Sequence, residues 1–229
     1  MAVQLTTTIH ATAASPTTGS ATWSHTHEAG GDLLVIAVAR TQNNANPDAA
    51  CTFDGVALTL ITSLNVIAYP GYKLYVWHLS DPGSKTANLV FDPNNGGSCK
   101  AAVLYASKAT GLDASIVGAT AKTADSVWGG SAFSVGLTYS AEGSLGFVAH
   151  AGEDDRLSNI TMSGVTRLAL TQAEDELRVA YGIDAAPSGA ETYTGAGTGS
   201  DGYIASFAVE LLAAVDASRR QHNVLGMGF

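Results

Sequence analysis

The feature that most restricts the fold of this chain is a succession of short β-prone runs, each closed by a cluster of Gly, Pro, Asn or Asp residues. The runs recur about every 10 to 18 residues, which is typical of antiparallel sheets, whereas strands alternating with helices would favour a parallel sheet. The sequence therefore predicts an all-β protein. The specific expectation is an antiparallel two-sheet β-sandwich, jelly-roll-like, with extended terminal arms.

Individual runs predict which strand faces are buried. Residues 32–40 (DLLVIAVAR) are almost wholly apolar, as expected for a central strand covered on both faces. Residues 71–80 (GYKLYVWHLS) alternate with the period of a strand, which places Tyr72 and Trp77 on opposite faces. Asp54-Gly55 stands between two apolar runs and predicts a tight hairpin turn.

The length of 229 residues suits one large domain, and no repeat of fixed period is present. We predict a single β-sandwich domain over residues 1–215, in which residues 1–20 form an N-terminal arm or first strand. No charged side chain precedes Glu28, so pairing with a sheet or a neighbouring subunit explains this segment better than solvation does. Residues 216–229 are predicted to form a C-terminal docking arm.

The C-terminal arm combines a basic pair with an apolar end (DASRRQHNVLGMGF). We expect Arg219 and Arg220 to contact a carboxylate or the rim of a partner subunit. Three apolar side chains would then enter pockets of that partner, namely Leu225, Met227 and Phe229. A disordered tail is the alternative interpretation.

The charge balance excludes some partners. The chain has 20 acidic residues against 11 Lys and Arg, a net charge of −9. Such a chain has little means of displacing counterions from nucleic acid or of adhering to an anionic membrane. The N-terminus has neither a basic nor an apolar leader segment, and no window of 18 apolar residues occurs, so we expect synthesis in a cytoplasm without a signal peptide.

Catalytic motifs are weak, and the sequence predicts a protein that is not an enzyme. It contains no G-x-S-x-G elbow, no H-E-x-x-H pair and no phosphate-binding loop. Glu174 and Glu176 resemble a glycosidase pair only in residue type, because that chemistry needs a set separation across a cleft.

Metal-ligand patterns in the sequence are equally weak, and no cofactor is predicted. His25 and His27 would share a strand face with Trp23 and could ligate a metal, or they are simply two half-exposed imidazoles. Glu153, Asp154 and Asp155 offer a weak calcium site or a solvated acidic loop. Cys51 and Cys99 lack zinc-type spacing, and we expect buried free thiols, with a cross-strand disulfide as the alternative.

Aromatic residues provide one more candidate contact. Trp128 sits in a Gly-rich loop, Ser126-Val127-Trp128-Gly129-Gly130, where an exposed ring would suit a glycan or a protein partner. Further candidates for a sugar-binding platform are Trp23, Tyr69, Tyr72 and Trp77. Of these, Trp77 lies in the middle of a strand-like run and fits a core position better.

Four segments together resemble β-sandwich structural proteins of tailed phages and prophages: residues 30–39, 52–60, 75–91 and 101–113. The resemblance implies a non-enzymatic virion protein of the capsid decoration or minor virion type, located in the virion. Its expected role is that of a cement protein, a homo-oligomer that binds the major capsid protein or other virion subunits. The alternative is a tail, fibre or head-spike receptor-binding module that recognises a cell-surface glycan.

Overall fold

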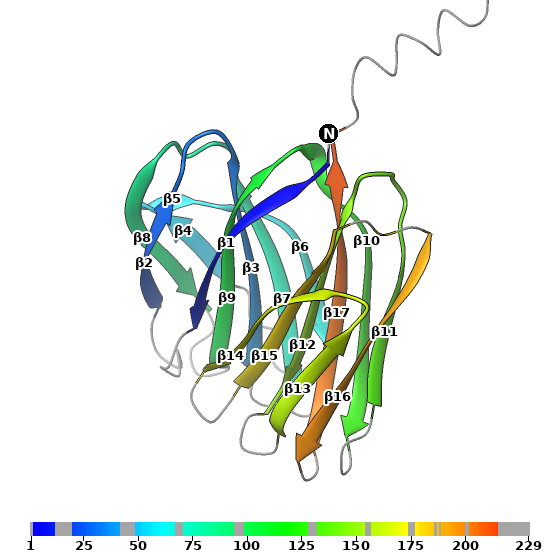
Figure 1. Cartoon of the computed structure of the whole chain (residues 1–229). Coiled ribbons are helices and arrows are strands. Elements are labelled where there is room, and N and C mark those ends of the chain that lie inside the picture. The colour runs from blue at the N-terminus through cyan, green and yellow to red at the C-terminus, as the bar shows by residue number, and fades with distance from the viewer. Residues whose placement is uncertain are drawn as a thin grey trace, which may run out of the picture.

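The computed structural model describes residues 2–11, 20–41, 49–66, 71–93, 99–127, 132–153, 157–173, 177–185, 187, 189–199 and 202–214. These ranges hold seventeen β-strands and no helix (Figure 1). Accordingly, none of the described residues forms a helix long and apolar enough to cross a membrane. The all-β prediction is confirmed.

The N-terminal half forms two antiparallel sheets. The N-terminal inner sheet has the order β1-β9-β3-β7-β6, with β1 at Gln4–Ala11, β9 at Cys99–Thr110, β3 at Asp32–Thr41, β7 at Gly71–Leu79 and β6 at Thr59–Val66. The N-terminal outer sheet has the order β2-β8-β4-β5, with β2 at Ala21–His27, β8 at Lys85–Asp92, β4 at Ala50–Phe53 and β5 at Val56–Ala57.

The C-terminal half forms two more antiparallel sheets. The C-terminal inner sheet has the order β10-β17-β12-β15-β14, with β10 at Leu112–Val127, β17 at Gly202–Ala213, β12 at Leu145–Gly152, β15 at Leu177–Asp184 and β14 at Thr166–Ala173. The C-terminal outer sheet has the order β11-β16-β13, with β11 at Ala132–Thr138, β16 at Ala190–Gly199 and β13 at Leu157–Ser163.

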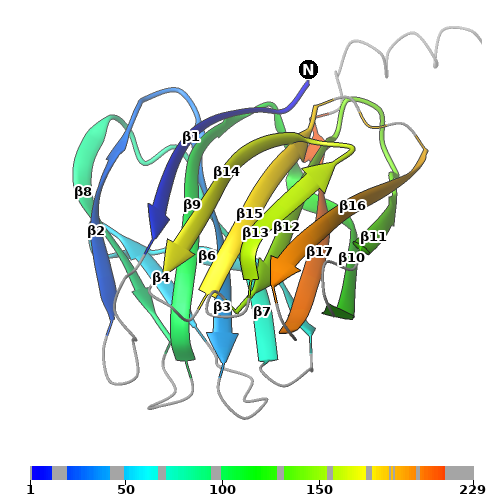
Figure 2. The same ribbon diagram turned by 60° about the horizontal axis from the view of Figure 1, so that its bottom comes forward.

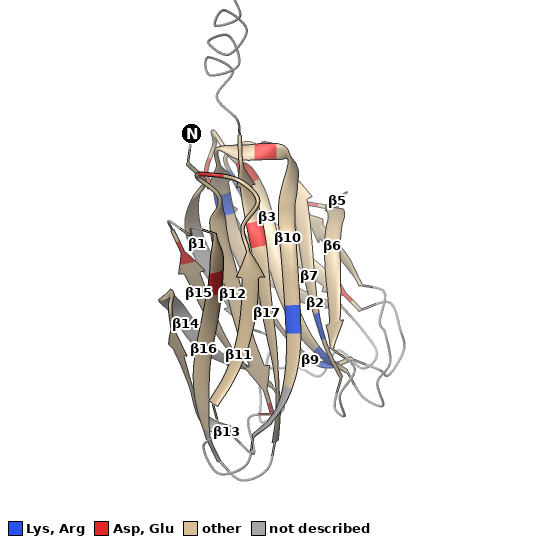
Figure 3. Cartoon of the chain, turned by 90° about the vertical axis from the view of Figure 1, so that its right-hand side faces the viewer, with Lys and Arg blue, Asp and Glu red and all other residues tan. Residues whose placement is uncertain are grey.

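The four sheets stack face to face, with the two inner sheets in the middle (Figures 2 and 3). Apolar side chains of the two inner sheets form the largest core cluster, while each inner sheet packs its other face against its own outer sheet. Two sheets were expected, and the difference has a physical reason. A sheet with two apolar faces must be covered on both, and each inner sheet is covered by the other inner sheet and by an outer sheet.

Three strand patterns are confirmed. In β3, seven consecutive side chains, from Leu33 to Ala39, are buried, so both faces are covered. In β7, Tyr72 packs into the core between the inner sheets and Trp77 packs against the N-terminal outer sheet. The Asp54-Gly55 turn joins β4 to β5 with positive φ values of 54° and 74°, the conformation that a two-residue type I′ hairpin requires.

The two halves repeat the same strand order. If β1, β9, β3, β7 and β6 correspond to β10, β17, β12, β15 and β14, the two inner sheets have the same order, and β2-β8-β4 then corresponds to β11-β16-β13. β1 lies beside β14 and β6 lies beside β10, so the corresponding strands run in opposite order across the interface. The halves are therefore related by an approximate two-fold axis along the strands near β3 and β12, as two subunits of an isologous dimer would be.

Cys51 and Cys99 are both free and buried between the two N-terminal sheets. Burial raises the pKa of each thiol to about 12, which keeps both protonated and unreactive at neutral pH. The prediction of buried free thiols is confirmed, and the disulfide alternative is wrong.

Candidate functional site

Many residues singled out in the sequence lie outside the described residues. They are Tyr69, Trp128, Asp154, Asp155, Glu174, Glu176, Arg219, Arg220, Leu225, Met227 and Phe229. The C-terminal arm and the Trp128 contact therefore stay predictions.

Glu153, the described member of the acidic loop, is buried and has a specific partner. Its carboxylate accepts a hydrogen bond from the guanidinium of Arg40, and the two form an ion pair. Arg40 belongs to the end of β3 and Glu153 follows the end of β12, the two corresponding strands at the approximate two-fold axis. The pair thus joins the two halves, whereas two identical charges at these positions would repel each other.

The prediction of a sugar-binding aromatic platform is wrong at two positions. Tyr72 and Trp77 are fully buried, and Trp77 stacks on Tyr75 with ring centroids 4.9 Å apart. Neither ring can contact a sugar, because a platform must present its face to solvent; the alternative reading of Trp77 as a core residue is confirmed. Trp23 is partly buried and packs against the same core.

His25 and His27 share the inner face of β2, as the strand period predicted, but both are buried rather than half-exposed. Their ring centroids are 6.4 Å apart, and both rings meet Phe53 edge-on, at 5.6 Å from His25 and 6.5 Å from His27. His27 Nε2 lies 3.1 Å from the carbonyl oxygen of Gly31. A carbonyl only accepts, so Nε2 of His27 carries the proton.

A small polar cavity opens beside His25, between the edge strands β1 and β2. Its volume is about 210 Å³, and it is lined by Thr6, His25, Thr26, Glu28 and Lys108. Lys108 Nζ donates to the carbonyl oxygen of Ala29 at 2.7 Å and lies 4.0 Å from the Glu28 carboxylate. In the part of the chain that the structure describes, no group of three or more His, Cys, Asp or Glu side chains is arranged to hold a metal ion.

The corresponding strand of the other half fills the same face with ordinary core residues. The inner face of β2 carries Trp23, His25 and His27, and the inner face of β11 carries Phe133, Val135 and Leu137. The shared architecture therefore does not require imidazoles in this layer. This difference makes the two histidines and their cavity the strongest candidate site among the described residues.

A second polar pair was not predicted from the sequence. His150 in β12 and Ser206 in β17 are directly paired across strands, with Nδ1 and Oγ 2.8 Å apart. Both are fully buried, and the His150 ring also meets Phe133 at 4.8 Å. A serine–histidine pair can generate a nucleophile only where a substrate reaches it, so this buried pair serves the core packing.

The buried His150 predicts loss of stability in acid. Desolvation lowers the pKa of His150 from 6.5 to about 4. The unfolded chain takes up this proton below pH 6.5 while the fold resists it, so stability falls as the pH drops from 6.5 to about 4, by up to about 3 kcal/mol. Urea unfolding should show a shallower pH dependence over this window for His150→Leu than for the wild type. An unchanged slope would contradict the assignment, and His222→Ala serves as control.

A buried carboxylate, Glu210 in β17, forms a third polar centre. It accepts hydrogen bonds from the backbone N–H groups of Ala119 (2.8 Å), Ser140 (2.9 Å) and Ala141 (3.1 Å), and from the Ser140 hydroxyl (2.8 Å). Ala119 lies where β10 shifts its register against β17, and Ser140 and Ala141 follow β11. The side chain thus fixes the irregular parts of the C-terminal half.

Comparisons of the chain with protein-family models, with curated proteins and with solved structures found no match in any of the three.

Proposed function

We propose that the protein is a non-enzymatic virion structural protein that decorates a capsid lattice and cements neighbouring subunits. The phage-like segments of the sequence support this proposal, because they contain most of β3, β8 and β9, all of β5 and parts of β4, β6 and β7. The four-sheet stack suits a cement protein. Both faces of its inner sheets are covered, and such a closely packed interior resists deformation by binding partners. Many identical copies would then multiply a modest contact energy by avidity.

The position of the two chain ends carries the proposal. Ala214 donates its backbone N–H to the carbonyl oxygen of Gly111 at 2.8 Å, and the Ala2 carbonyl also lies against Gly111. The described chain therefore begins and ends side by side at one end of the stack (Figure 1). A C-terminal arm that follows Ala214 would leave from this end and could reach a neighbour without disturbing the core.

We interpret each half as a jelly roll. In the N-terminal half β1-β9-β3-β7 faces β2-β8-β4-β5, which alternates the strands of two Greek keys between the sheets. In the C-terminal half β10-β17-β12-β15 faces β11-β16-β13, which is the same order without a counterpart of β5. The chain would then be a fused pair of jelly rolls with a single copy of the C-terminal arm.

Deletion of residues 218–229 is expected to lower binding to capsid particles at least about tenfold, because the arm supplies the anchoring contacts. The deletion begins after the last described strand, so the fold should remain intact. Co-sedimentation of the purified full-length and truncated chains with particles from the source lysate measures the loss, and Arg219→Ala/Arg220→Ala serves as a milder variant. Equal binding of the truncated chain would reject the arm as anchor.

The copy number in particles tests the capsid assignment itself. Hundreds of copies per particle would support a lattice coat. A small copy number would favour the tail or fibre module and its glycan, and absence from particles would reject the virion proposal.

A further inference from the structure

We propose that His25 and His27 form a binding site for a late transition-metal ion such as Zn²⁺, Cu²⁺ or Ni²⁺, at the mouth between β1 and β2. Imidazole nitrogen is a preferred ligand of these ions. The proposal is independent of the function proposed above, because it rests only on the residues around this cavity.

The state of His27 is the first argument. Its Nε2 proton is committed to the carbonyl oxygen of Gly31, so the neutral ring carries its lone pair on Nδ1. Nδ1 is buried and has no hydrogen-bond partner among the described residues. A backbone carbonyl that holds one ring nitrogen and leaves the other free is a common second contact of metal-ligating histidines.

The relative position of the rings is the second argument. Two imidazoles on one tetrahedral ion, at metal–nitrogen distances of about 2.0–2.1 Å, place their ring centroids about 5 Å apart. The observed separation of 6.4 Å is wider, so a side-chain rotation must bring the two rings closer when an ion binds. Phe53 contacts both rings and keeps them side by side on one face of β2.

The cavity supplies access and further ligands. It borders His25 and also contains Glu28, whose side chain is 73% exposed and therefore able to turn toward an ion. Water would complete the coordination. A site with two protein nitrogens and one adaptable carboxylate should bind one ion with modest, micromolar affinity. The Glu28 carboxylate also offsets the charge of Lys108, whose Nζ lies 4.0 Å away.

The other half of the chain provides a matched variant. β11 carries Val135 and Leu137 on the face where β2 carries the two histidines. His25→Val/His27→Leu should therefore fold, because this architecture already accommodates these side chains in the same layer.

Titration calorimetry of the untagged full-length chain with ZnCl₂, and then with Cu²⁺ and Ni²⁺, tests the site. The expected result is one ion per chain and a rise of several degrees in the thermal midpoint with excess ion. The double variant should lose at least about tenfold in affinity, Glu28→Gln somewhat less, and His222→Ala nothing.

Two results would overturn the proposal: equal affinity of the double variant, or no binding of any of the three ions to the wild type. If the double variant does not fold, His25→Val and His27→Leu are measured singly. Each must weaken binding, and retention of full affinity by both would also reject the site.

Discussion

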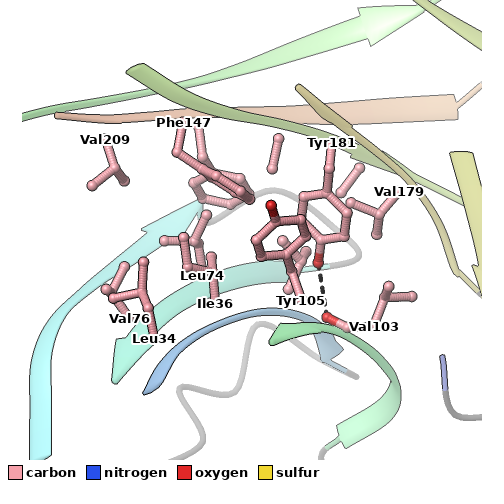
Figure 4. Packing of buried hydrophobic residues seen from close by; sticks show 14 of the residues in the cluster. Leu34, Ile36, Leu74, Val76, Val103, Tyr105, Phe147, Val179, Tyr181 and Val209 are labelled. Carbon is pink, nitrogen blue, oxygen red and sulfur yellow. Dashed lines mark hydrogen bonds between the residues drawn. The ribbon is translucent and has the colours of Figure 1, made fainter. Parts of the chain in front are cut away.

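Replacing Phe147 with alanine is expected to lower the free energy of unfolding by about 3–5 kcal/mol. Phe147 is fully buried in β12 and lies at the centre of an aromatic cluster between the two inner sheets (Figure 4). Its ring meets Tyr105 of the N-terminal inner sheet at 5.0 Å and Tyr181 of its own sheet at 5.5 Å. The cavity left by the substitution would open where the two halves meet.

The cluster also joins the halves by a hydrogen bond. The Tyr181 hydroxyl donates to the carbonyl oxygen of Val103 in β9 at 2.8 Å. Because the largest core belongs to both halves, the chain should unfold in one cooperative transition, and Phe147→Ala should shift that transition as a whole.

Urea unfolding followed by circular dichroism and tryptophan fluorescence measures both expectations. Leu60→Ala is the control, because Leu60 is 48% exposed and its truncation should cost less than about 1 kcal/mol. Two separate transitions in the wild type, or a loss for Phe147→Ala no larger than that for Leu60→Ala, would contradict a shared core.

The fold class could be predicted because it depends on local patterns. Alternation in residues 71–80, the apolar run at 32–40 and the Asp54-Gly55 turn each determine the local backbone, and each is confirmed. The period of two also placed His25 and His27 on one face. These patterns need no knowledge of which strands pair.

The four-sheet stack could not be predicted, because most strands buried on both faces do not look apolar. Every residue of β12 (LGFVAHAG) is buried, yet it contains two glycines and a histidine. In β9, small residues and Ser107 occupy buried positions. Small side chains allow sheets to approach closely, but they add little to the hydrophobic pattern of a strand. Burial of the second strand face therefore cannot be predicted from the sequence.

The repeated strand order of the two halves could not be predicted for a related reason. Corresponding strands preserve which face is buried but not which residues fill it, as the exchange of His25 and His27 for Val135 and Leu137 illustrates. Arg40 and Glu153, at the ends of corresponding strands, even carry opposite charges. Only the two histidines of the candidate site could be predicted from the sequence. Phe53 and Lys108 could not, because they reach the histidines from β4 and β9 through long-range strand pairing.

Replacing Glu210 with alanine is expected to lower the free energy of unfolding by about 4 kcal/mol at neutral pH, because three backbone N–H groups and one hydroxyl lose their acceptor together. The Glu210 side chain is fully buried, and its hydrogen bonds from Ala119, Ser140 and Ala141 are partly buried. Glu142→Ala is the matched control, since Glu142 is exposed in the adjacent turn and its loss should change the free energy by less than about 1 kcal/mol.

The pH dependence of the unfolding free energy distinguishes the contribution of the ionised Glu210 carboxylate from that of side-chain packing. Burial alone would raise the pKa of Glu210, but the hydrogen bonds from Ala119 and Ser140 outweigh it and the pKa lies below its usual value. A lowered pKa means that the folded chain keeps the carboxylate ionised after the unfolded chain has protonated it. The stabilisation is therefore complete above the unfolded pKa, and it disappears as the pH falls through the folded one.

The difference in unfolding free energy between wild type and Glu210→Ala should accordingly shrink as the pH falls below about 4.3. Urea unfolding from pH 7 down to pH 3 measures it, on a His150→Leu background that removes the imidazole's own response to acid. A difference that stays constant over this range would mean that Glu210 acts through its volume alone. A shrinking difference would establish that an ionised side chain in β17 holds β10 and the segment after β11 in place.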